Sequence, residues 1–384
     1  MTLSSFAADF VGLVRNLYST DEFVPLHAPR FLGSEQDNVI EAIQSTFVST
    51  VGKQVEEFEQ RISDYTGSKY TIATINGTAA LHTALLCCGV RQGEEVITSP
   101  LTFVATCNAI KYCGADPIFI DVDQDTLGMS PDRLEEFLAE NSEIRDDNLL
   151  WNQRTNRIIR ACLPVHNLGH PVQIDKIKVI CDRYNVVLIE DAAESLGSVY
   201  KGIHTGKVGR VGVISFNGNK IVTTGGGGAL ITDDYRIAET AKHKTTTAKQ
   251  PHPWLYIHDD VGYNYRLPNL NAALGCAQID QLDDFVRSKR SLADQYRRWF
   301  EDKSVEFIVE PISAKSNYWL NAILLKDRTE RDMFLQHTND EGVMTRPMWT
   351  PMHTLPMYKN CQKNDLSTAE SIEDRLVNIP SSVV

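Results

Sequence analysis

Lys220 is the residue of this sequence whose setting most favours covalent chemistry. It comes just after an apolar run at residues 211–216, and a glycine-rich stretch at residues 223–228 follows it. A lysine that is desolvated beside a buried strand, near other cationic groups, has a lowered pKa, so its neutral amine can attack a carbonyl and form a Schiff base. The glycines would let the backbone pass close beside a flat ring. The alternative is a solvated loop lysine, as most lysines are.

Asp191 ends a second strand-like run, at residues 187–191, and two small alanines follow it. A carboxylate at the end of a buried strand is well placed to hold a cationic ring nitrogen inside a cleft. Such a contact keeps pyridoxal phosphate a strong electron sink. The alternative is an acid that faces water or caps the next segment.

The run Asn76, Gly77 and Thr78 joins a short β-rich segment to a helical pattern. Gly77 lets the backbone approach a ligand, the free N–H groups of a first helical turn favour an anion, and Thr78 adds a hydroxyl donor. The alternative is an ordinary helix cap, because Asn and Thr are common there.

These residues need a scaffold, and the pattern from residue 71 onward alternates strand and helix. Strands are expected at residues 71–75, 95–98, 117–121, 157–162, 186–190 and 211–216, and helices at 78–86, 103–112 and 174–184. Such alternation predicts βαβ units and a mostly parallel sheet that is covered on both faces. Open parallel sheets bind ligands at the carboxyl ends of their strands, so the polar residues after these strands are expected to share one crevice.

Two further segments complete the expected organisation. Residues 140–156 are polar and are interpreted as an irregular surface insertion. Residues 269–300 predict one long helix or a kinked pair, and the strand at 318–325 and helix at 330–337 indicate a smaller α+β domain. We therefore expect an N-terminal arm and large α/β domain over residues 1–265, and a long helix with the smaller domain over 266–384.

Composition excludes several classes of protein. The net charge of −12 argues against nucleic-acid binding, which needs clustered Lys and Arg. The apolar runs are too short to span a bilayer and no signal peptide is recognised, so a cytoplasmic protein without membrane contact is expected. No metal site is expected, because the Asp-rich run at residues 121–125 lacks the glycine and glutamate of a calcium loop.

Taken together, these features resemble the sugar aminotransferases of the DegT/DnrJ/StrS group over about residues 25–380. The shared motifs lie at residues 49–53, 76–82, 102–106, 164–166, 190–194, 215–220 and 262–266. The resemblance implies an α/β fold of the aspartate aminotransferase type (fold type I) and pyridoxal 5'-phosphate as the cofactor.

The resemblance also implies roles around the cofactor ring. Lys220 would form the Schiff base and Asp191 would pair with the pyridine nitrogen. Phe103 matches the aromatic that stacks on the ring, although it can also be interpreted as a core residue. Glu194 stands near the cofactor's phenolic oxygen, where many members carry His or Gln, and an acid there would need a proton or a cationic partner.

Four residues match the family's phosphate contacts. Gly77, Thr78 and Ser215 would come from the same chain as Lys220. Asn264 matches a ligand donated by the neighbouring subunit, so the resemblance implies a homodimer with shared active sites.

The implied reaction is transfer of an amino group from glutamate to a nucleotide-linked sugar. The sequence looks most like enzymes that act on the C4 ketone of a UDP-linked 4-keto-6-deoxy-N-acetylhexosamine, in bacillosamine and legionaminic acid pathways. His353 and Tyr358 lie in a segment that resembles the substrate-facing region, and for His353 a packing role is the alternative.

Three alternatives stay open. The same chemistry can act on a GDP- or dTDP-linked ketosugar. A related dehydratase is disfavoured, because dehydratases that resemble this family replace the lysine that stands here as Lys220. A non-catalytic ligand-sensing protein on this fold is the third, although such regulators usually carry a DNA-binding domain, and no basic appended segment is recognised.

Overall fold

A nine-stranded sheet organises the larger part of the computed structural model, which describes residues 3–384. Seven of its strands form one continuous path: β1 (Tyr70–Thr74), β2 (Glu95–Thr98), β3 (Asp116–Phe119), β6 (Arg157–Leu163), β7 (Val187–Asp191), β10 (Val211–Ser215) and β11 (Gly228–Thr232). Their order is β3-β2-β6-β7-β10-β11-β1. The pairs from β3 to β10 are parallel, and β11 runs antiparallel to both its neighbours. The mostly parallel sheet predicted from the sequence is confirmed.

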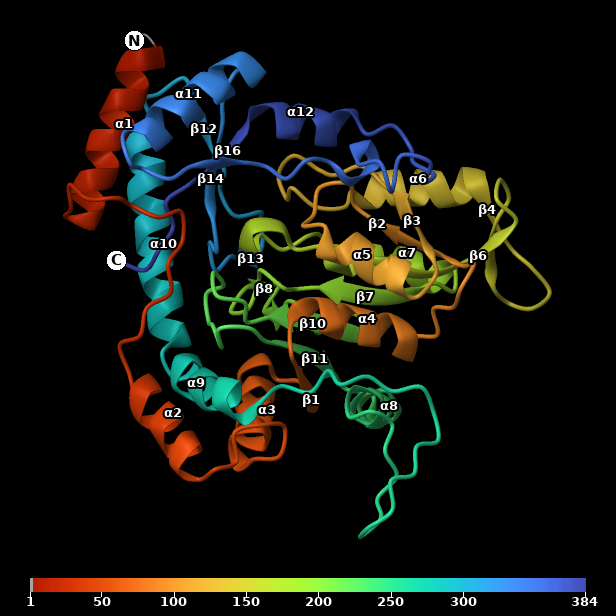
Figure 1. Cartoon of the computed structure of the whole chain (residues 1–384). Helices are drawn as coiled ribbons and strands as arrows, with labels where there is room; N and C mark the ends of the chain where they lie inside the picture. The colour runs from red at the N-terminus through yellow and green to blue at the C-terminus, as the bar shows by residue number, and fades with distance from the viewer. Residues whose placement is uncertain (1–2) are drawn as a thin grey trace.

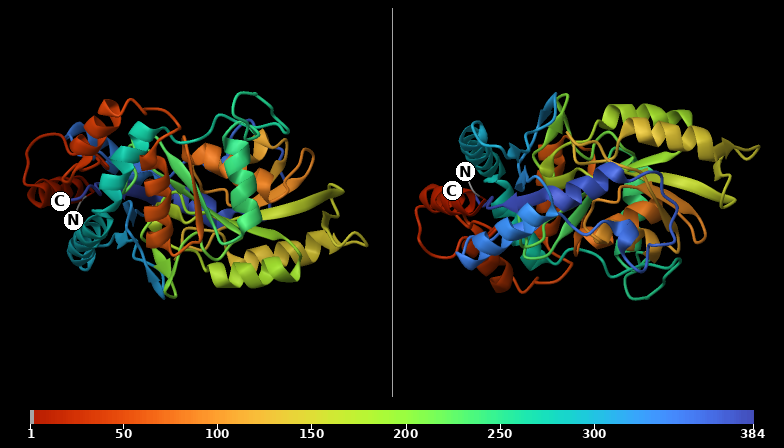
Figure 2. Two further views of the ribbon diagram at one scale, coloured as in Figure 1. Left: turned by 90° about the horizontal axis from the view of Figure 1, so that it is seen from below. Right: turned by 90° about the horizontal axis from the view of Figure 1, so that it is seen from above.

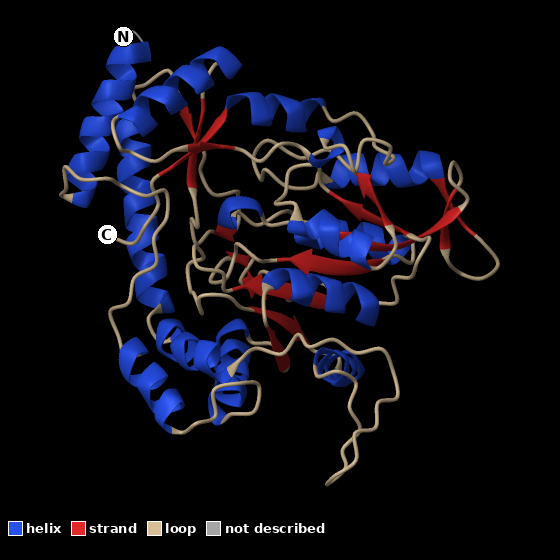
Figure 3. Cartoon of the chain, viewed as in Figure 1, coloured by secondary structure: helices blue, strands red, loops and turns tan. Residues whose placement is uncertain are grey.

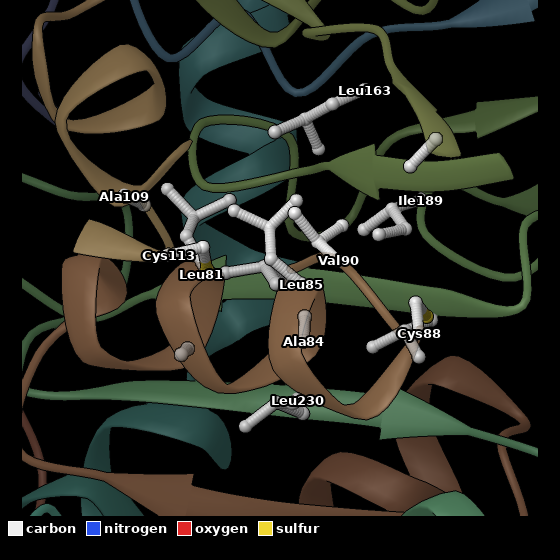
Figure 4. Close-up of a cluster of buried hydrophobic side chains, with 14 of the residues drawn as sticks. Leu81, Ala84, Leu85, Cys88, Val90, Ala109, Cys113, Leu163, Ile189 and Leu230 are labelled. Atoms are coloured by element: carbon white, nitrogen blue, oxygen red, sulfur yellow. The ribbon is translucent and has the colours of Figure 1, made fainter. Parts of the chain in front are cut away.

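Helices cover both faces of this sheet (Figure 3). They are α4 (Gly77–Cys87), α5 (Ala105–Tyr112) and α8 (Tyr235–Thr245) on one face, and α6 (Pro131–Asn141) and α7 (Ile174–Arg183) on the other. Alternation within each strand supplies both cores, because successive side chains point to opposite faces. Leu163 and Ile189 pack under α4, whereas Cys162 and Leu188 pack under α6 and α7. Figure 4 shows the first of these cores, with Leu81 and Leu85 of α4 against the strands.

Three of the remaining helices gather near both termini at one end of the molecule (Figures 1 and 2): α1 (Leu3–Tyr18), α10 (Leu282–Phe300) and α11 (Arg328–Asp340). A fourth, α12 (Ser367–Arg375), extends from there along the top of the view in Figure 1, whereas α2 (Glu35–Gln44), α3 (Lys53–Thr66) and α9 (Asn269–Ile279) pack together beside β1. A four-stranded antiparallel sheet has the order β12-β14-β16-β15 and consists of β12 (Glu306–Phe307), β14 (Asn321–Leu324), β16 (Leu376–Ile379) and β15 (Arg346–Pro347). A three-stranded sheet of β8 (Val199–Tyr200), β9 (Ile203–His204) and β13 (Ala314–Lys315) lies between the two parts.

Residues 269–300 form the kinked pair of the two predicted alternatives, since α9 ends at Ile279 and α10 begins at Leu282. The first helix packs against this C-terminal part, because its apolar stripe is buried there. Phe10 lies 5.2 Å from Phe334 between ring centroids, and Phe6 shares the same core. The division at residue 265 stays a proposal, and α1 belongs by its packing to the smaller core.

Two expectations for local structure were wrong. Residues 140–156 form a hairpin of β4 (Ser142–Ile144) and β5 (Leu150–Asn152), and β5 extends the central sheet by pairing with β6. Buried Asn152 anchors the hairpin by donating to Glu95 at 2.8 Å. The polarity of the segment therefore did not mean that its side chains face water. The strand predicted from residue 318 begins only at Asn321, because the preceding residues bind the large domain. Within residues 3–384, none of the helices combines the length and apolar character that crossing a bilayer demands.

Candidate active site

A cavity of about 390 Å³ lies at the carboxyl ends of the parallel strands. Seven of the predicted site residues line it, although they are spread over more than a third of the chain: Gly77, Thr78, Phe103, Asp191, Glu194, Ser215 and Lys220. Trp319 and Trp349 complete the wall from the C-terminal part. The crevice predicted from the polar strand ends therefore exists, and it lies between the large sheet and the smaller domain.

Asp191 is the last residue of β7, and its carboxylate is buried in the cavity wall. Thr106 donates its hydroxyl to Oδ2 at 2.8 Å, and the amide of Ala193 donates to Oδ1 at 3.1 Å. Burial raises the pKa of this carboxyl, while the two hydrogen bonds and the charge of Lys220 oppose that rise. A buried acid that is fixed in orientation and short of positive charge is suited to a cationic ring nitrogen.

Lys220 lies five residues after the end of β10, and its side chain is largely buried. Its Nζ is 3.3 Å from Oε1 of Glu194 and 3.7 Å from the centroid of the Trp319 ring. The alternative of a solvated loop lysine is excluded by this burial. The amine opens onto the same cavity as Asp191.

Glu194 has the cationic partner that an acid at this position requires. Its Oε1 faces Lys220, and its Oε2 accepts the amide of Leu168 at 2.9 Å. Burial raises the pKa of this carboxyl, and the charge of Lys220 acts most strongly in the opposite direction.

The beginning of α4 and the end of β10 form an anion-binding corner. A Cβ placed on Gly77 would lie 3.1 Å from the hydroxyl of Ser215, so this hydroxyl stands directly beside the first turn of the helix. Asn76 caps the helix by accepting the amide of Ala79 at 2.8 Å, so the amides of Gly77 and Thr78 are the ones that remain for a ligand. On β11, a side chain at Gly228 would come within 2.6 Å of the backbone of Asn76 and Gly77, so glycine is needed there for the corner to form.

Phe103 is about half exposed, at 54 %, and it borders the cavity. Its ring lies edge-on to Trp349, with 6.4 Å between ring centroids. The interpretation as a buried core aromatic is therefore wrong, and a free ring face is available to a flat ligand.

The other three predicted residues do not line the cavity. Asn264 is exposed, and its backbone bridges to that of Thr246, where the two arms of the segment between α8 and α9 meet. This segment projects from the body of the molecule (Figure 1). His353 is buried and paired with Glu370 at 3.0 Å, and Tyr358 is fully buried with its hydroxyl donating to Asn108 at 2.5 Å. The substrate role of His353 and Tyr358 stays a prediction, and it would require both side chains to leave these partners.

Two residues that the sequence did not single out contact the predicted ones. Thr106 holds Asp191, and it belongs to a motif that the resemblance had already marked, at residues 102–106. Trp319 lies just before β14, in the run that the sequence predicted as a strand of the smaller domain, and no local signal connects it to Lys220, about a hundred residues earlier.

The residues of the cavity fit pyridoxal phosphate. The anion corner suits its phosphate, the free face of Phe103 suits stacking on its ring, Asp191 suits its ring nitrogen and Lys220 suits its aldehyde. All four are present in one cavity, and their spacing in the sequence did not guarantee this.

Comparison with known proteins places the chain in a family. The model of the DegT/DnrJ/EryC1/StrS aminotransferase family matches residues 31–383. The chain is 37 % identical over 361 residues to the GDP-perosamine synthase of Escherichia coli O157:H7, covering 94 % of this chain and 93 % of the relative. Two further relatives, from Caulobacter vibrioides and Vibrio cholerae, carry the same name. The chain is also 38 % identical over 334 residues to EpsN of Bacillus subtilis (strain 168), a candidate pyridoxal phosphate-dependent aminotransferase. This match covers 87 % of this chain and 83 % of the relative.

The fold agrees with these relatives. The crystal structure of the aminotransferase TlmJ from Streptoalloteichus hindustanus superposes with a TM-score of 0.84 at 26 % identity, covering 94 % of this chain and 93 % of that one. The predicted fold type, enzyme class and cofactor, pyridoxal 5'-phosphate, are confirmed. This chain belongs to the DegT/DnrJ/EryC1/StrS aminotransferase family.

Proposed function

We propose that this protein transfers the amino group of glutamate to the C4 ketone of a GDP-linked 4-keto-6-deoxy sugar. This reaction is supported chiefly by one observation: the Lys220 amine and the Asp191 carboxylate line the same cavity, together with the anion-binding corner. The nucleotide is supported by the relatives named GDP-perosamine synthase, which match nearly the whole chain. They favour the GDP-linked alternative over the UDP-linked substrate that the resemblance first implied.

Each residue of the cavity has a proposed task. Pyridoxal phosphate, when bound, supplies an electron sink that makes the carbon–hydrogen bond next to the transferred nitrogen acidic. Asp191, held in place by Thr106, would pair as a carboxylate with the ring nitrogen. Gly77, Thr78 and Ser215 would bind the phosphate through backbone amides and hydroxyls, and Phe103 would cover the ring.

Lys220 moves the proton. In the first half of the reaction its Nζ would take the proton from the α-carbon of glutamate and pass it to the cofactor, and in the second half it would take a proton back from the cofactor and deliver it to C4 of the sugar. Glu194 and the indole of Trp319 keep the amine within the cavity between these transfers. Trp319 and Trp349 line the cavity with apolar surface, which limits the access of water.

The substrate assignment is tested with a panel of ketosugars. The purified enzyme is given glutamate and the 4-keto-6-deoxy sugars of GDP, UDP and dTDP, and kcat/KM is measured for each. We expect the GDP-linked sugar to exceed the others by roughly tenfold or more, because a site built to hydrogen-bond one base leaves buried polar groups unpaired with another. A higher kcat/KM for the UDP-linked sugar would reverse the assignment. Failure of glutamate to bleach the visible band of the bound cofactor would favour a ligand-sensing protein.

A homodimer with shared sites is part of the proposal. The projecting segment that leads to Asn264 exposes several large apolar side chains, which is unusual for a surface that stays in water: Trp254, Leu255, Tyr256, Ile257 and Val261. Asn264 itself is exposed and outside its own chain's cavity. A second copy would cover this segment and receive the amide of Asn264 at its phosphate site.

Mixing two inactive variants tests the shared site. Lys220→Ala and Asn264→Ala are each expected to be impaired, and chains of the two are unfolded together and refolded. If Asn264 serves the neighbouring subunit, each mixed dimer has one intact site, so about a quarter of full activity returns for random pairing. If Asn264 serves its own chain, the mixture recovers nothing.

A further inference from the structure

The amine of Lys220 lies between a carboxylate and the face of an indole. Glu194 stands 3.3 Å away on one side, and the Trp319 ring centroid stands 3.7 Å away on the other. Glu194 and Trp319 are both buried, and the side chain of Lys220 is 12 % exposed. An ammonium ion in such a position gains from both neighbours with little loss to solvent screening.

Trp319 is fixed at both ends. Its indole Nε1–H donates to the backbone carbonyl of Asn219 at 2.7 Å, so the ring is tied to the residue directly before the lysine. Its backbone amide donates to Oδ1 of Asn317 at 2.8 Å, and Nδ2 of Asn317 donates to the carbonyl of Glu194 at 3.0 Å. One asparagine of the smaller domain therefore sets the positions of both neighbours of Lys220.

The loop at Leu168 and Gly169, which contacts Glu194 and Asn317, has a strained backbone. Leu168 adopts φ +57°, a left-handed conformation that is unfavourable for leucine, and its amide thereby reaches Oε2 of Glu194. Gly169, at φ +95°, lies so close to Asn317 that a Cβ would come within 1.9 Å of its Oδ1. Strain of this kind persists where the surrounding structure enforces it, and it gathers at functional sites.

We propose that Glu194 and Trp319 form a seat for the protonated amine of Lys220, and that Trp319 is a positioning residue for proton transfer. The inference rests on the proposed function, in which Nζ carries a proton from one carbon to another. The carboxylate attracts the ammonium, and the indole face attracts it without being able to accept the proton, so the proton stays available for delivery. Trp319 also prevents the amine from turning toward the smaller domain.

Two substitutions of Trp319 separate the ring face from simple packing. Trp319→Leu removes the aromatic face and the Nε1–H, whereas Trp319→Phe keeps an aromatic face alone. The holoenzyme is mixed with glutamate in a single turnover, and the loss of the visible band is followed with ordinary and α-deuterated glutamate. We expect Trp319→Leu to be slower by about ten- to thirtyfold, as expected for a desolvated cation–π contact, and Trp319→Phe to recover part of that loss.

The isotope effect shows which step has slowed. If the seat serves proton transfer, the deuterium effect in Trp319→Leu is at least as large as in the unchanged enzyme. A smaller effect would place the defect in glutamate binding and overturn the proposal, as would a Trp319→Phe protein no faster than Trp319→Leu. Trp151→Leu is the matched control, because Trp151 also lies against a cation, Arg145 at 4.4 Å, but on the distant hairpin of β5.

Failure of the proposed function gives a different result. In that case the unchanged enzyme itself does not lose its visible band with glutamate, so the failure does not arise from the substitutions of Trp319. An unaltered visible band and melting temperature before glutamate is added exclude misfolding of the variants.

Discussion

Lys220→Ala is expected to lower kcat by roughly 10⁴-fold or more, the largest effect of any single substitution in this protein. The variant loses both the nucleophile that bonds to the cofactor aldehyde and the base that moves the proton, and general-base catalysis alone is worth about 10²- to 10⁴-fold. The absorption band of the lysine-bound cofactor should also disappear, although the anion corner can still hold the phosphate. Steady-state turnover and a visible spectrum measure both effects.

Lys326→Ala is the matched control for this substitution. Lys326 is exposed and lies outside the cavity, so its loss should leave turnover and spectrum unchanged. Turnover by Lys220→Ala close to that of the unchanged enzyme would refute the assignment of Lys220 as nucleophile and base.

Asp191→Asn is expected to lower kcat by about 10²- to 10³-fold, the size that follows loss of one preorganised electrostatic partner in a water-excluded site. The amide has nearly the same shape, so it can still accept the amide of Ala193 and remain beside Thr106. It carries no charge, however, and the ring nitrogen would lose its proton more readily. The melting temperature should therefore change little while kcat falls.

A cofactor methylated at its ring nitrogen distinguishes charge from structure in this variant. The methyl group fixes the positive charge, so it should raise the activity of Asp191→Asn relative to the same variant with the natural cofactor. Asp182→Asn serves as the control, since Asp182 is an exposed acid paired with Lys178 on α7. If Asp191→Asn were as active as the unchanged enzyme, the proposed contact with the ring nitrogen would be wrong.

Lys220 and Asp191 could be found in the sequence because the residues next to each of them in the chain predict its position after a buried strand. Each follows an apolar run that had to be a buried strand, and parallel strands end at one edge of a sheet. The same reasoning placed Gly77, Thr78 and Ser215 correctly in the cavity. It failed for the hairpin at residues 142–152, where a few polar residues such as Asn152 make buried contacts that composition does not reveal.

The sequence by itself determined the parallel sheet, the family and the main residues of the cavity, because period, strand ends and motifs are local properties of the chain. The tertiary structure alone decided what surrounds the amine. Trp319 meets Lys220, and Asn317 holds Glu194, only because the smaller domain packs against the edge of the sheet. Contacts between residues a hundred positions apart depend on that packing, and no periodicity along the chain encodes them.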